Sequence, residues 1–291
     1  MAEWGGVKGK RVVLTGATNG IGLAAAEELA RRGAQLTLVG RSRSKLDAAV
    51  RSVEAAASGG ATVETAEANL ESQASVRALA DALLDRYQSI RVLINNAGAI
   101  FSERALTEDG IERTWALNHL APFLLTNLLL PRLLASAPAR IITTTSDAHK
   151  NRLIPFDDLK AERSYKTRGF QRYGESKLGN ILFTVELAKR LQGTGVSANS
   201  VHPGLVATGF NRNNGAFMTG VMTLIRPFAR GPKKGAETMV WLADSEEVGD
   251  QTGGYFLDKR WAMPSGPAQD GAAAARLWEV SEQQTRAALQ A

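Results

Sequence analysis

Short apolar runs alternate with helix-forming stretches through the first 145 residues of this 291-residue chain. Such runs predict buried strands, and the stretches between them have the composition of helices. Strand and helix in strict alternation predict βαβ units, in which a parallel sheet is covered by helices on both faces. The predicted strands are 11–14, 35–39, 61–63, 91–94 and 140–143, and the predicted helices are 21–32, 44–57, 72–87 and 110–134.

The second half of the chain extends the same pattern. Strands are expected at 196–201 and 254–257, and helices at 173–191, 233–243 and 272–289. No internal repeat or low-complexity linker divides the sequence. We therefore expect an α/β fold, a single doubly wound domain over residues 1–291, with segments at about 150–170 and 209–231 that rim and cover a site.

Composition excludes several kinds of site. The chain has no cysteine and only three histidines, so disulfides, thiolate nucleophiles and a metal centre are not expected. Its net charge is +6, but the basic residues are scattered among acidic ones, which argues against nucleic-acid binding. The longest apolar stretch, 121–134, is shorter than the ~20 residues of a membrane span. We expect a cytoplasmic protein with no signal peptide and no integral membrane segment.

A glycine-rich turn follows the first predicted strand and opens the first predicted helix. Its glycines are Gly16, Gly20 and Gly22. Glycines allow a tight turn and close approach to a phosphate, while the helix N-terminus offers free N–H groups and a positive dipole end. The turn therefore predicts a pyrophosphate site, although a plain tight turn is the simpler alternative.

The end of the second strand should meet the ribose that carries the adenine. An acid there would bind the 2′-hydroxyl of NAD, and an arginine would bind the 2′-phosphate of NADP. The chain continues with Gly40, Arg41, Ser42 and Arg43, and has no acid before Asp47. This favours NADP(H), with NAD(H) as the alternative.

Tyr173 and Lys177 are four residues apart in a predicted helix, so they share one face. A free tyrosine has a pKa of roughly 10 and exchanges protons poorly at neutral pH. A fixed positive charge nearby would lower that pKa toward the working range. The pair is common by chance, and its meaning depends on the motifs that accompany it.

Taken together, the motifs resemble the short-chain dehydrogenase/reductase family, whose members have a Rossmann fold. The closer resemblance is to its retinol-dehydrogenase-like subgroup, through 146–149, 156–159, 176–180, 186–196 and 276–281. The family motifs, in family order over nearly the whole chain, are Thr15-Gly16-x3-Gly20-x-Gly22, Asn95-Asn96-Ala97-Gly98, Asn118, Ser146, Tyr173-x3-Lys177 and His202-Pro203-Gly204.

The resemblance implies four catalytic roles. Tyr173 exchanges a proton with the substrate oxygen, and Lys177 lowers the pKa of Tyr173 while binding the nicotinamide ribose. Ser146 hydrogen-bonds the substrate oxygen, and Asn118 holds a water that links Lys177 to solvent. For the serine role, Thr145 is the alternative among the hydroxyls at the end of this strand.

The resemblance also implies the cofactor contacts. Asn69 stands where many members have the acid that receives the adenine amino group, and its amide oxygen could still accept that bond. The full set of expected cofactor-binding residues is Gly16, Thr18, Asn19, Gly20, Ile21, Gly22, Arg41, Ser42, Asn69, Leu70, Asn96, Ala97, Gly98, Tyr173, Lys177, Pro203, Gly204, Val206 and Thr208.

The apolar content of the segment at 209–231 suggests a small hydrophobic substrate. The expected function is an NADP(H)-dependent oxidoreductase that interconverts a hydrophobic alcohol and its aldehyde or ketone by hydride transfer. A non-catalytic NADP-sensing protein and a sugar-nucleotide epimerase are the alternatives.

Helices 121–134 and 173–191 are where family members usually associate, so a homodimer is one expectation. Core packing explains the apolar pattern of these helices equally well. His149 is expected at the substrate entrance or in a solvated loop.

Overall fold

The computed structural model describes residues 4–206 and 229–285, and it is built around one eight-stranded sheet. The strand order is β3-β2-β1-β4-β5-β6-β7-β8, and every neighbouring pair is parallel except the last. The predicted doubly wound sheet is confirmed; the antiparallel edge strand β8 was not predicted. The strands are β1 (Arg11–Thr15), β2 (Gln35–Gly40), β3 (Thr62–Glu67), β4 (Val92–Asn95), β5 (Ala139–Thr144), β6 (Val196–Val201), β7 (Tyr255–Leu257) and β8 (Arg260–Trp261).

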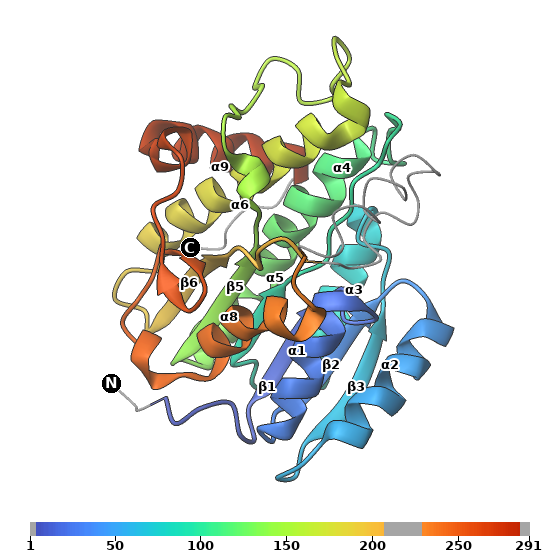
Figure 1. Cartoon of the computed structure of the whole chain (residues 1–291), viewed down its shortest axis with the longest axis vertical. Helices are drawn as coiled ribbons and strands as arrows, with labels where there is room; N and C mark the ends of the chain where they lie inside the picture. Colours follow the sequence, from blue (N-terminus) through green and yellow to red (C-terminus); the bar gives the residue numbers. More distant parts are fainter. Residues whose placement is uncertain (1–3, 207–228, 286–291) are drawn as a thin grey trace.

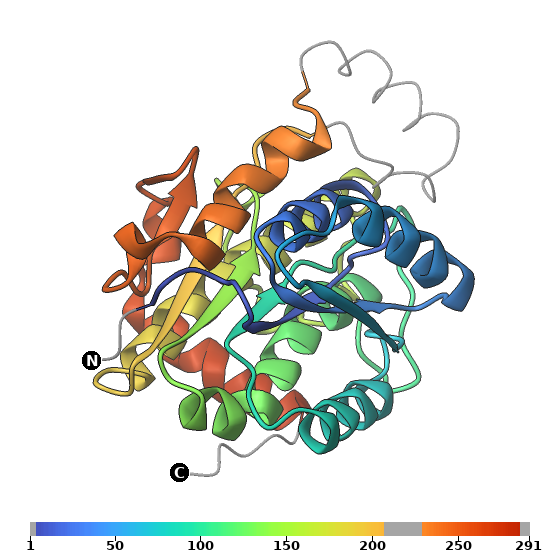
Figure 2. The ribbon, with the colours of Figure 1, turned by 90° about the horizontal axis from the view of Figure 1, so that it is seen from below.

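Helices cover both faces of the sheet. Helices α1, α2 and α8 pack together on one face, and α3, α5 and α6 lie on the other, with α9 packed outside α6 (Figures 1 and 2). The bounds are α1 (Gly20–Arg31), α2 (Arg43–Ala56), α3 (Gln73–Arg86), α4 (Arg113–Trp115), α5 (Ala121–Ala135), α6 (Phe170–Arg190), α8 (Pro232–Asp244) and α9 (Gly271–Thr285). Short helical turns are η1 (Ala116–Leu120), η2 (Asp147–His149), η3 (Thr167–Gly169), η6 (Glu246–Val248) and η7 (Gly266–Gln269).

Strand β1 shows how the apolar sequence fills two cores. Successive side chains of a strand point to opposite faces, so a wholly apolar strand can be buried on both sides. Val12 and Leu14 belong to the core under α1, α2 and α8, whereas Val13 belongs to the core under α3, α5 and α6. All three side chains are fully buried.

The strand order reverses at β1, which lies between β2 and β4. In open α/β sheets, ligands bind in the crevice beyond the carboxyl ends of the strands at such a switch point. The segments that follow β1, β2, β4, β5 and β6 carry most of the expected site residues, because parallel strands end at the same edge of the sheet.

The predicted helix 110–134 is interrupted and begins later than expected. Gly110 has a φ of +71°, outside a right-handed helix, and the Glu112 carboxylate accepts the amides of Thr114 and Trp115, both at 2.9 Å. Helix α4 therefore begins at Arg113 and runs through the π-helical turn η1 into α5. Such turns are rare and often occur at functional sites, and this one carries Asn118.

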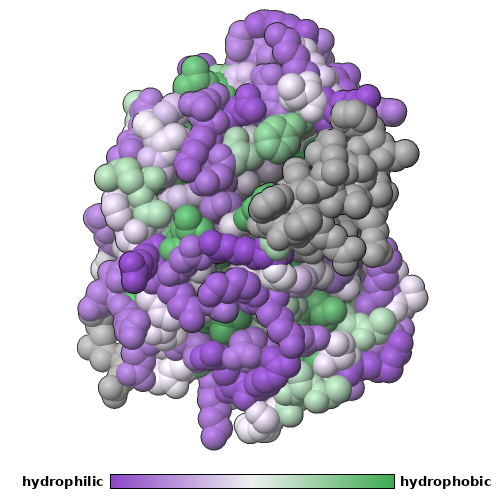
Figure 3. All heavy atoms as spheres, in the orientation of Figure 1, coloured by the Kyte–Doolittle hydropathy of each residue, from purple (hydrophilic) through white to green (hydrophobic). Residues whose placement is uncertain are grey.

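Over helices α1, α2 and α8 the surface is largely hydrophilic, and apolar atoms occur there only in small separate patches (Figure 3). Among the residues that the structure describes, no helix combines the length and apolar character needed to cross a membrane.

Candidate active site

The turn between β1 and α1 is shaped by glycines that no other residue could replace. A Cβ on Gly16, whose φ is +68°, would lie 2.8 Å from the Cα of Ala97. A Cβ on Gly22 would lie 2.2 Å from the carbonyl oxygen of Gly16. Asn19, at the N-cap of α1, makes no side-chain bond to the first amides of the helix. This tight, uncapped helix start fits an anionic group such as a pyrophosphate.

The segment after β4 is fastened to this turn by hydroxyl and amide groups. The Thr15 hydroxyl accepts the backbone amides of Asn96 at 2.9 Å and Ala97 at 3.1 Å. The Asn96 side chain donates back to the Thr15 carbonyl oxygen at 3.1 Å. These bonds bring Asn96 and Ala97 alongside the glycine turn, as expected of residues that contact one cofactor. The segment after β6 also lies close to the start of α1. A Cβ on Gly235 of α8 would lie 2.7 Å from Val206 and 3.3 Å from Ile21, so these two side chains are neighbours.

At the end of β2 the structure places an acid that the sequence did not reveal. The Arg41 guanidinium forms an ion pair with Glu71 at 3.1 Å. Glu71 lies in the segment between β3 and α3, and its backbone amide donates to the Asn69 side-chain oxygen at 3.2 Å. The Asn69 oxygen that was expected to meet the adenine is thus engaged within its own loop. Arg43 pairs with Asp47 at 3.0 Å, one helical turn away.

Lys177 is buried and held by β5. Its ammonium donates to the carbonyl oxygen of Thr144 at 3.0 Å, and Asn180 donates to the same oxygen at 3.2 Å. Burial lowers the pKa of Lys177 to about 8. A Cβ on Gly98 would lie 3.3 Å from the Lys177 nitrogen, so this glycine lets the segment after β4 approach the ammonium group.

Tyr173 is half-buried, and its hydroxyl is hydrogen-bonded to Ser146. Burial raises the pKa of Tyr173 to about 12, and the bond with Ser146 opposes this only in part. The Lys177 nitrogen is 5.5 Å from the centre of the Tyr173 ring. Desolvation of the phenolate is thus the larger influence on this pKa, and the lowering by Lys177 that the resemblance implies stays a prediction.

The neighbouring hydroxyl of Thr145 faces another way. It donates to the carbonyl oxygen of Lys177 at 3.3 Å and accepts the amide of Ser146. Thr145 is fully buried against the backbone of α6, whereas the Ser146 hydroxyl reaches Tyr173 and also accepts the Ala148 amide at 3.2 Å. The geometry therefore favours Ser146 over Thr145 for contact with a substrate oxygen.

Asn118 ties the π-helical turn to two other segments. Its side chain exchanges two hydrogen bonds with the backbone of Ala99, both at 2.9 Å, and donates to the Ser176 hydroxyl at 3.0 Å. Asn118 is completely buried, and a Cβ on Gly98 would lie 3.1 Å from its oxygen. It thus lies beside Lys177, as the sequence predicts.

His149 lies neither at an open entrance nor in a solvated loop, so both interpretations were wrong. It is fully buried, and its Nδ1 bonds the Ser146 carbonyl oxygen at 2.7 Å. Its Nε2 accepts the amide of Ser265 at 3.1 Å, which fixes Nδ1–H as the donor to Ser146. Burial lowers the pKa of His149. The ring connects the backbone of Ser146 to the segment before η7, a link between distant residues that the sequence does not signal.

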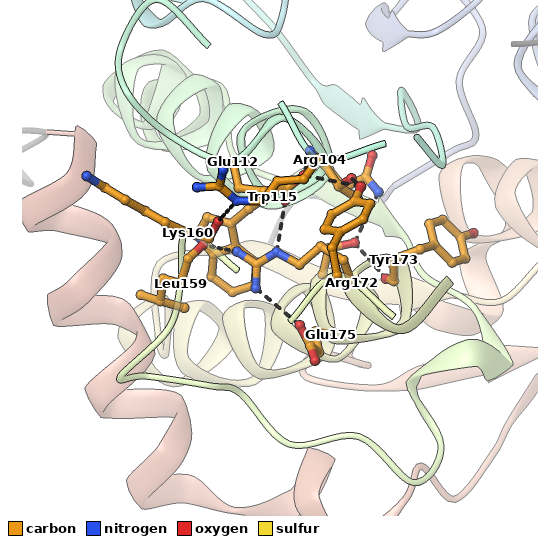
Figure 4. A network of polar contacts seen from close by, with 12 residues as sticks. Arg104, Glu112, Trp115, Leu159, Lys160, Arg172, Tyr173 and Glu175 are labelled. Carbon is orange, nitrogen blue, oxygen red and sulfur yellow. Dashed lines mark hydrogen bonds and ion pairs between the residues drawn. The ribbon is translucent and has the colours of Figure 1, made fainter. Parts of the chain in front are cut away.

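A buried ionic cluster lies behind Tyr173 (Figure 4). Arg172 donates to Glu112 at 2.9 Å and to Glu175 at 3.2 Å, and also bonds the carbonyl oxygen of Leu159. Arg172 and Glu112 are 2% and 0% exposed. Tyr173 lies on the same turn of α6 and points away from the cluster (Figure 4). These contacts fix the start of α6 to α4 and to the rim segment, so they position Tyr173 indirectly.

The expected residues gather at one edge of the sheet in two groups. Ser146, Tyr173, Lys177 and Asn118 lie together beyond β5, and the glycine turn with Asn96–Gly98 lies beyond β1 and β4. Thr208, and residues 209–228 of the expected covering segment, lie outside the described residues.

Comparison with known proteins gives consistent matches. A family model described as short chain dehydrogenase matches residues 10–157. Retinol dehydrogenase 12 of Mus musculus is 41% identical over 275 residues, which cover 94% of this chain and 86% of that protein. A candidate daunorubicin C-13 ketoreductase of Streptomyces sp. strain C5 is 42% identical over 277 residues, covering 95% of this chain and 93% of that protein.

Solved structures match over the same length. An uncharacterised protein from Mycobacterium paratuberculosis aligns with a TM-score of 0.79 and 32% identity over 100% of both chains. RhlG of Pseudomonas aeruginosa, solved as an NADP active-site complex, aligns with a TM-score of 0.69 and 25% identity, covering 94% of this chain and 100% of that one.

Proposed function

This chain belongs to the short-chain dehydrogenase family, and we propose that it interconverts a hydrophobic alcohol and its aldehyde or ketone with NADP(H). The observation that carries this proposal is the hydrogen bond between Tyr173 and Ser146, with the Lys177 ammonium buried beside the Tyr173 ring. A phenol and a hydroxyl that converge on one point can bind a substrate oxygen and exchange a proton with it.

Bound nicotinamide would supply the hydride, or accept it, at the substrate carbon. Tyr173 would donate its proton to the carbonyl oxygen during reduction and take it back during oxidation. Ser146 would donate a hydrogen bond to the same oxygen as negative charge develops there. With a pKa raised to about 12, Tyr173 is protonated at neutral pH before cofactor binds, which is the form that reduction requires.

The remaining residues would hold the cofactor. The glycine turn and the free amides of α1 suit the pyrophosphate, and Asn96 to Gly98 leave room for the adenosine side. Arg41 at the end of β2 would bind the 2′-phosphate of NADP(H), since a guanidinium matches phosphate geometry. RhlG, whose structure is an NADP complex, supports this choice by likeness.

Exposed apolar side chains beside the site support a hydrophobic substrate. Phe170 is 42% exposed, and the centre of its ring lies 6.2 Å from that of Tyr173. Met263 is 63% exposed, two residues before Ser265, whose amide bonds His149. Relatives named for retinol and for daunorubicin, both with large apolar frameworks, are consistent with this class.

The proposal is tested by screening aldehydes, ketones and alcohols with NADPH and NADH in parallel, followed by Tyr173→Phe. This variant should lose about 1,000-fold in kcat/KM, within the range of general acid–base catalysis, and bind NADPH nearly as tightly as wild type. Tyr87→Phe is the matched control, because Tyr87 bonds Thr37 and Glu64 away from the site. Turnover by Tyr173→Phe at the wild-type rate would contradict the mechanism, and NADPH binding without turnover of any substrate would favour the NADP-sensing alternative.

A further inference from the structure

We propose that Glu71 limits the preference of this protein for NADP(H) over NAD(H) by holding Arg41. This inference rests on the proposed function and adds a specificity-determining residue to it. The sequence indicated an arginine without a nearby acid at the end of β2, whereas the fold brings Glu71 to 3.1 Å from the Arg41 guanidinium.

The acid in this pair is the better anchored partner. The Glu71 side chain is 14% exposed, and that of Arg41 is 56% exposed. The Glu71 carboxylate also accepts hydrogen bonds from two nitrogens of Arg113, at 2.5 and 3.3 Å. The Glu71 backbone amide donates to the Asn69 side-chain oxygen. Arg113 itself lies over the ring of Phe101, 4.0 Å from its centre. Glu71 therefore stays in place when Arg41 turns to another partner.

A 2′-phosphate at the end of β2 would have to draw Arg41 away from Glu71. It would also meet the negative charge of a carboxylate that cannot withdraw. NAD(H) has an uncharged hydroxyl at this position. It does not need to break the Arg41–Glu71 pair, and the Glu71 carboxylate does not repel it. Glu71 should therefore weaken NADP(H) binding and leave NAD(H) binding nearly unchanged, which narrows the difference between the two cofactors.

The test is the variant Glu71→Gln, which keeps an oxygen for Arg113 and removes the charge. Fluorescence titration with NADPH and NADH, and calorimetry with 2′,5′-ADP and 5′-AMP, measure binding without turnover. The ratio of NADPH to NADH affinity should rise about fivefold, the upper range for a surface ion pair. An unchanged ratio, or a shift toward NADH, would overturn the inference.

Glu28→Gln is the matched control, because Glu28 also bridges two arginines, Arg31 and Arg32, both at 3.0 Å, in the last turns of α1 away from the glycine turn. It should leave the affinity ratio as in wild type. In the background of Arg41→Ala, Glu71→Gln should raise the ratio much less than in the wild-type background, since only the direct repulsion between Glu71 and the 2′-phosphate is then removed. A full fivefold rise in that background would show that Glu71 acts without Arg41 and would reject the pairing.

Failure of this inference differs from failure of the proposed function. If wild type binds both dinucleotides and only the effect of Glu71→Gln is missing, the inference alone is wrong. If wild type binds no pyridine nucleotide, the proposed function is wrong and the inference falls with it.

Discussion

At the scale of single residues, Lys177 combines a buried position with a charge that its proposed role requires. One hydrogen bond to the Thr144 carbonyl oxygen partly replaces the water that it loses. Its lowered pKa, about 8, leaves the ammonium form dominant at neutral pH, yet keeping that charge buried costs roughly 3 kcal/mol of folding stability. The buried Lys177 ammonium that the proposed function needs therefore destabilises the folded protein.

The pKa of Lys177 gives a prediction with a definite sign. Between about 8 and 10.5 the unfolded chain binds the proton that folded Lys177 has released, so this lysine makes stability rise with pH across that window. Lys177→Met removes the titration. The free energy of unfolding of the variant should exceed that of wild type by less at pH 9.5 than at pH 7, the difference shrinking by about 2 kcal/mol. Urea unfolding at the two pH values measures this. Parallel pH profiles for the two proteins would contradict it.

Single residues also show what a sequence can indicate about a site. Tyr173 and Lys177 were predictable because four residues on a helix fix their shared face, and Gly16 and Gly22 because a strand-to-helix turn needs them. Glu71 and His149 were not, since their partners Arg41 and Ser265 are 30 and 116 residues away along the chain. Contacts of that range depend on how the strands are ordered in the sheet, which local patterns do not specify.

At the scale of elements, the cluster of Arg172, Glu112 and Glu175 joins three segments. It connects the start of α4, the rim segment at Leu159 and the first turn of α6, where Tyr173 lies. Element positions followed well from the apolar pattern, but the division of residues 110–134 into α4, η1 and α5 did not. The reason is that Glu112 caps α4 with the same carboxylate that binds Arg172.

Arg172→Met should destabilise the protein by about 3–5 kcal/mol, because it leaves two buried carboxylates without their cation. Chemical denaturation measures this. Adding Glu112→Gln and Glu175→Gln to the same protein should restore part of the loss, since no buried charge then remains unpaired. Arg163→Met is the control: Arg163 pairs with Asp157 at the surface, and its loss should not shift the unfolding midpoint. Equal losses for the two arginines would show that burial of the cluster has no energetic consequence.

At the scale of the whole molecule, α9 covers the face on which a homodimer contact was one expectation. Trp278 of α9 stacks on Phe183 of α6 at 5.9 Å between ring centres and meets Phe123 of α5 edge-on at 5.0 Å. Arg190 lies over the outer ring of this group, 4.3 Å from the centre of Trp278. The apolar rings of Phe123 on α5 and Phe183 on α6 are therefore covered within the chain by α9, which follows both helices in the sequence.

Trp278→Ala should loosen α9 and expose this face. Removing a buried tryptophan costs about 3–5 kcal/mol, and the uncovered rings of Phe123 and Phe183 would then pair between molecules. Light scattering over a range of concentrations should show larger species for this variant than for wild type. Trp261→Ala is the control, because Trp261 on β8 is 56% exposed. A stable assembly of wild-type chains that breaks up when α5 or α6 is altered, with α9 intact, would instead mean that this face binds a second subunit.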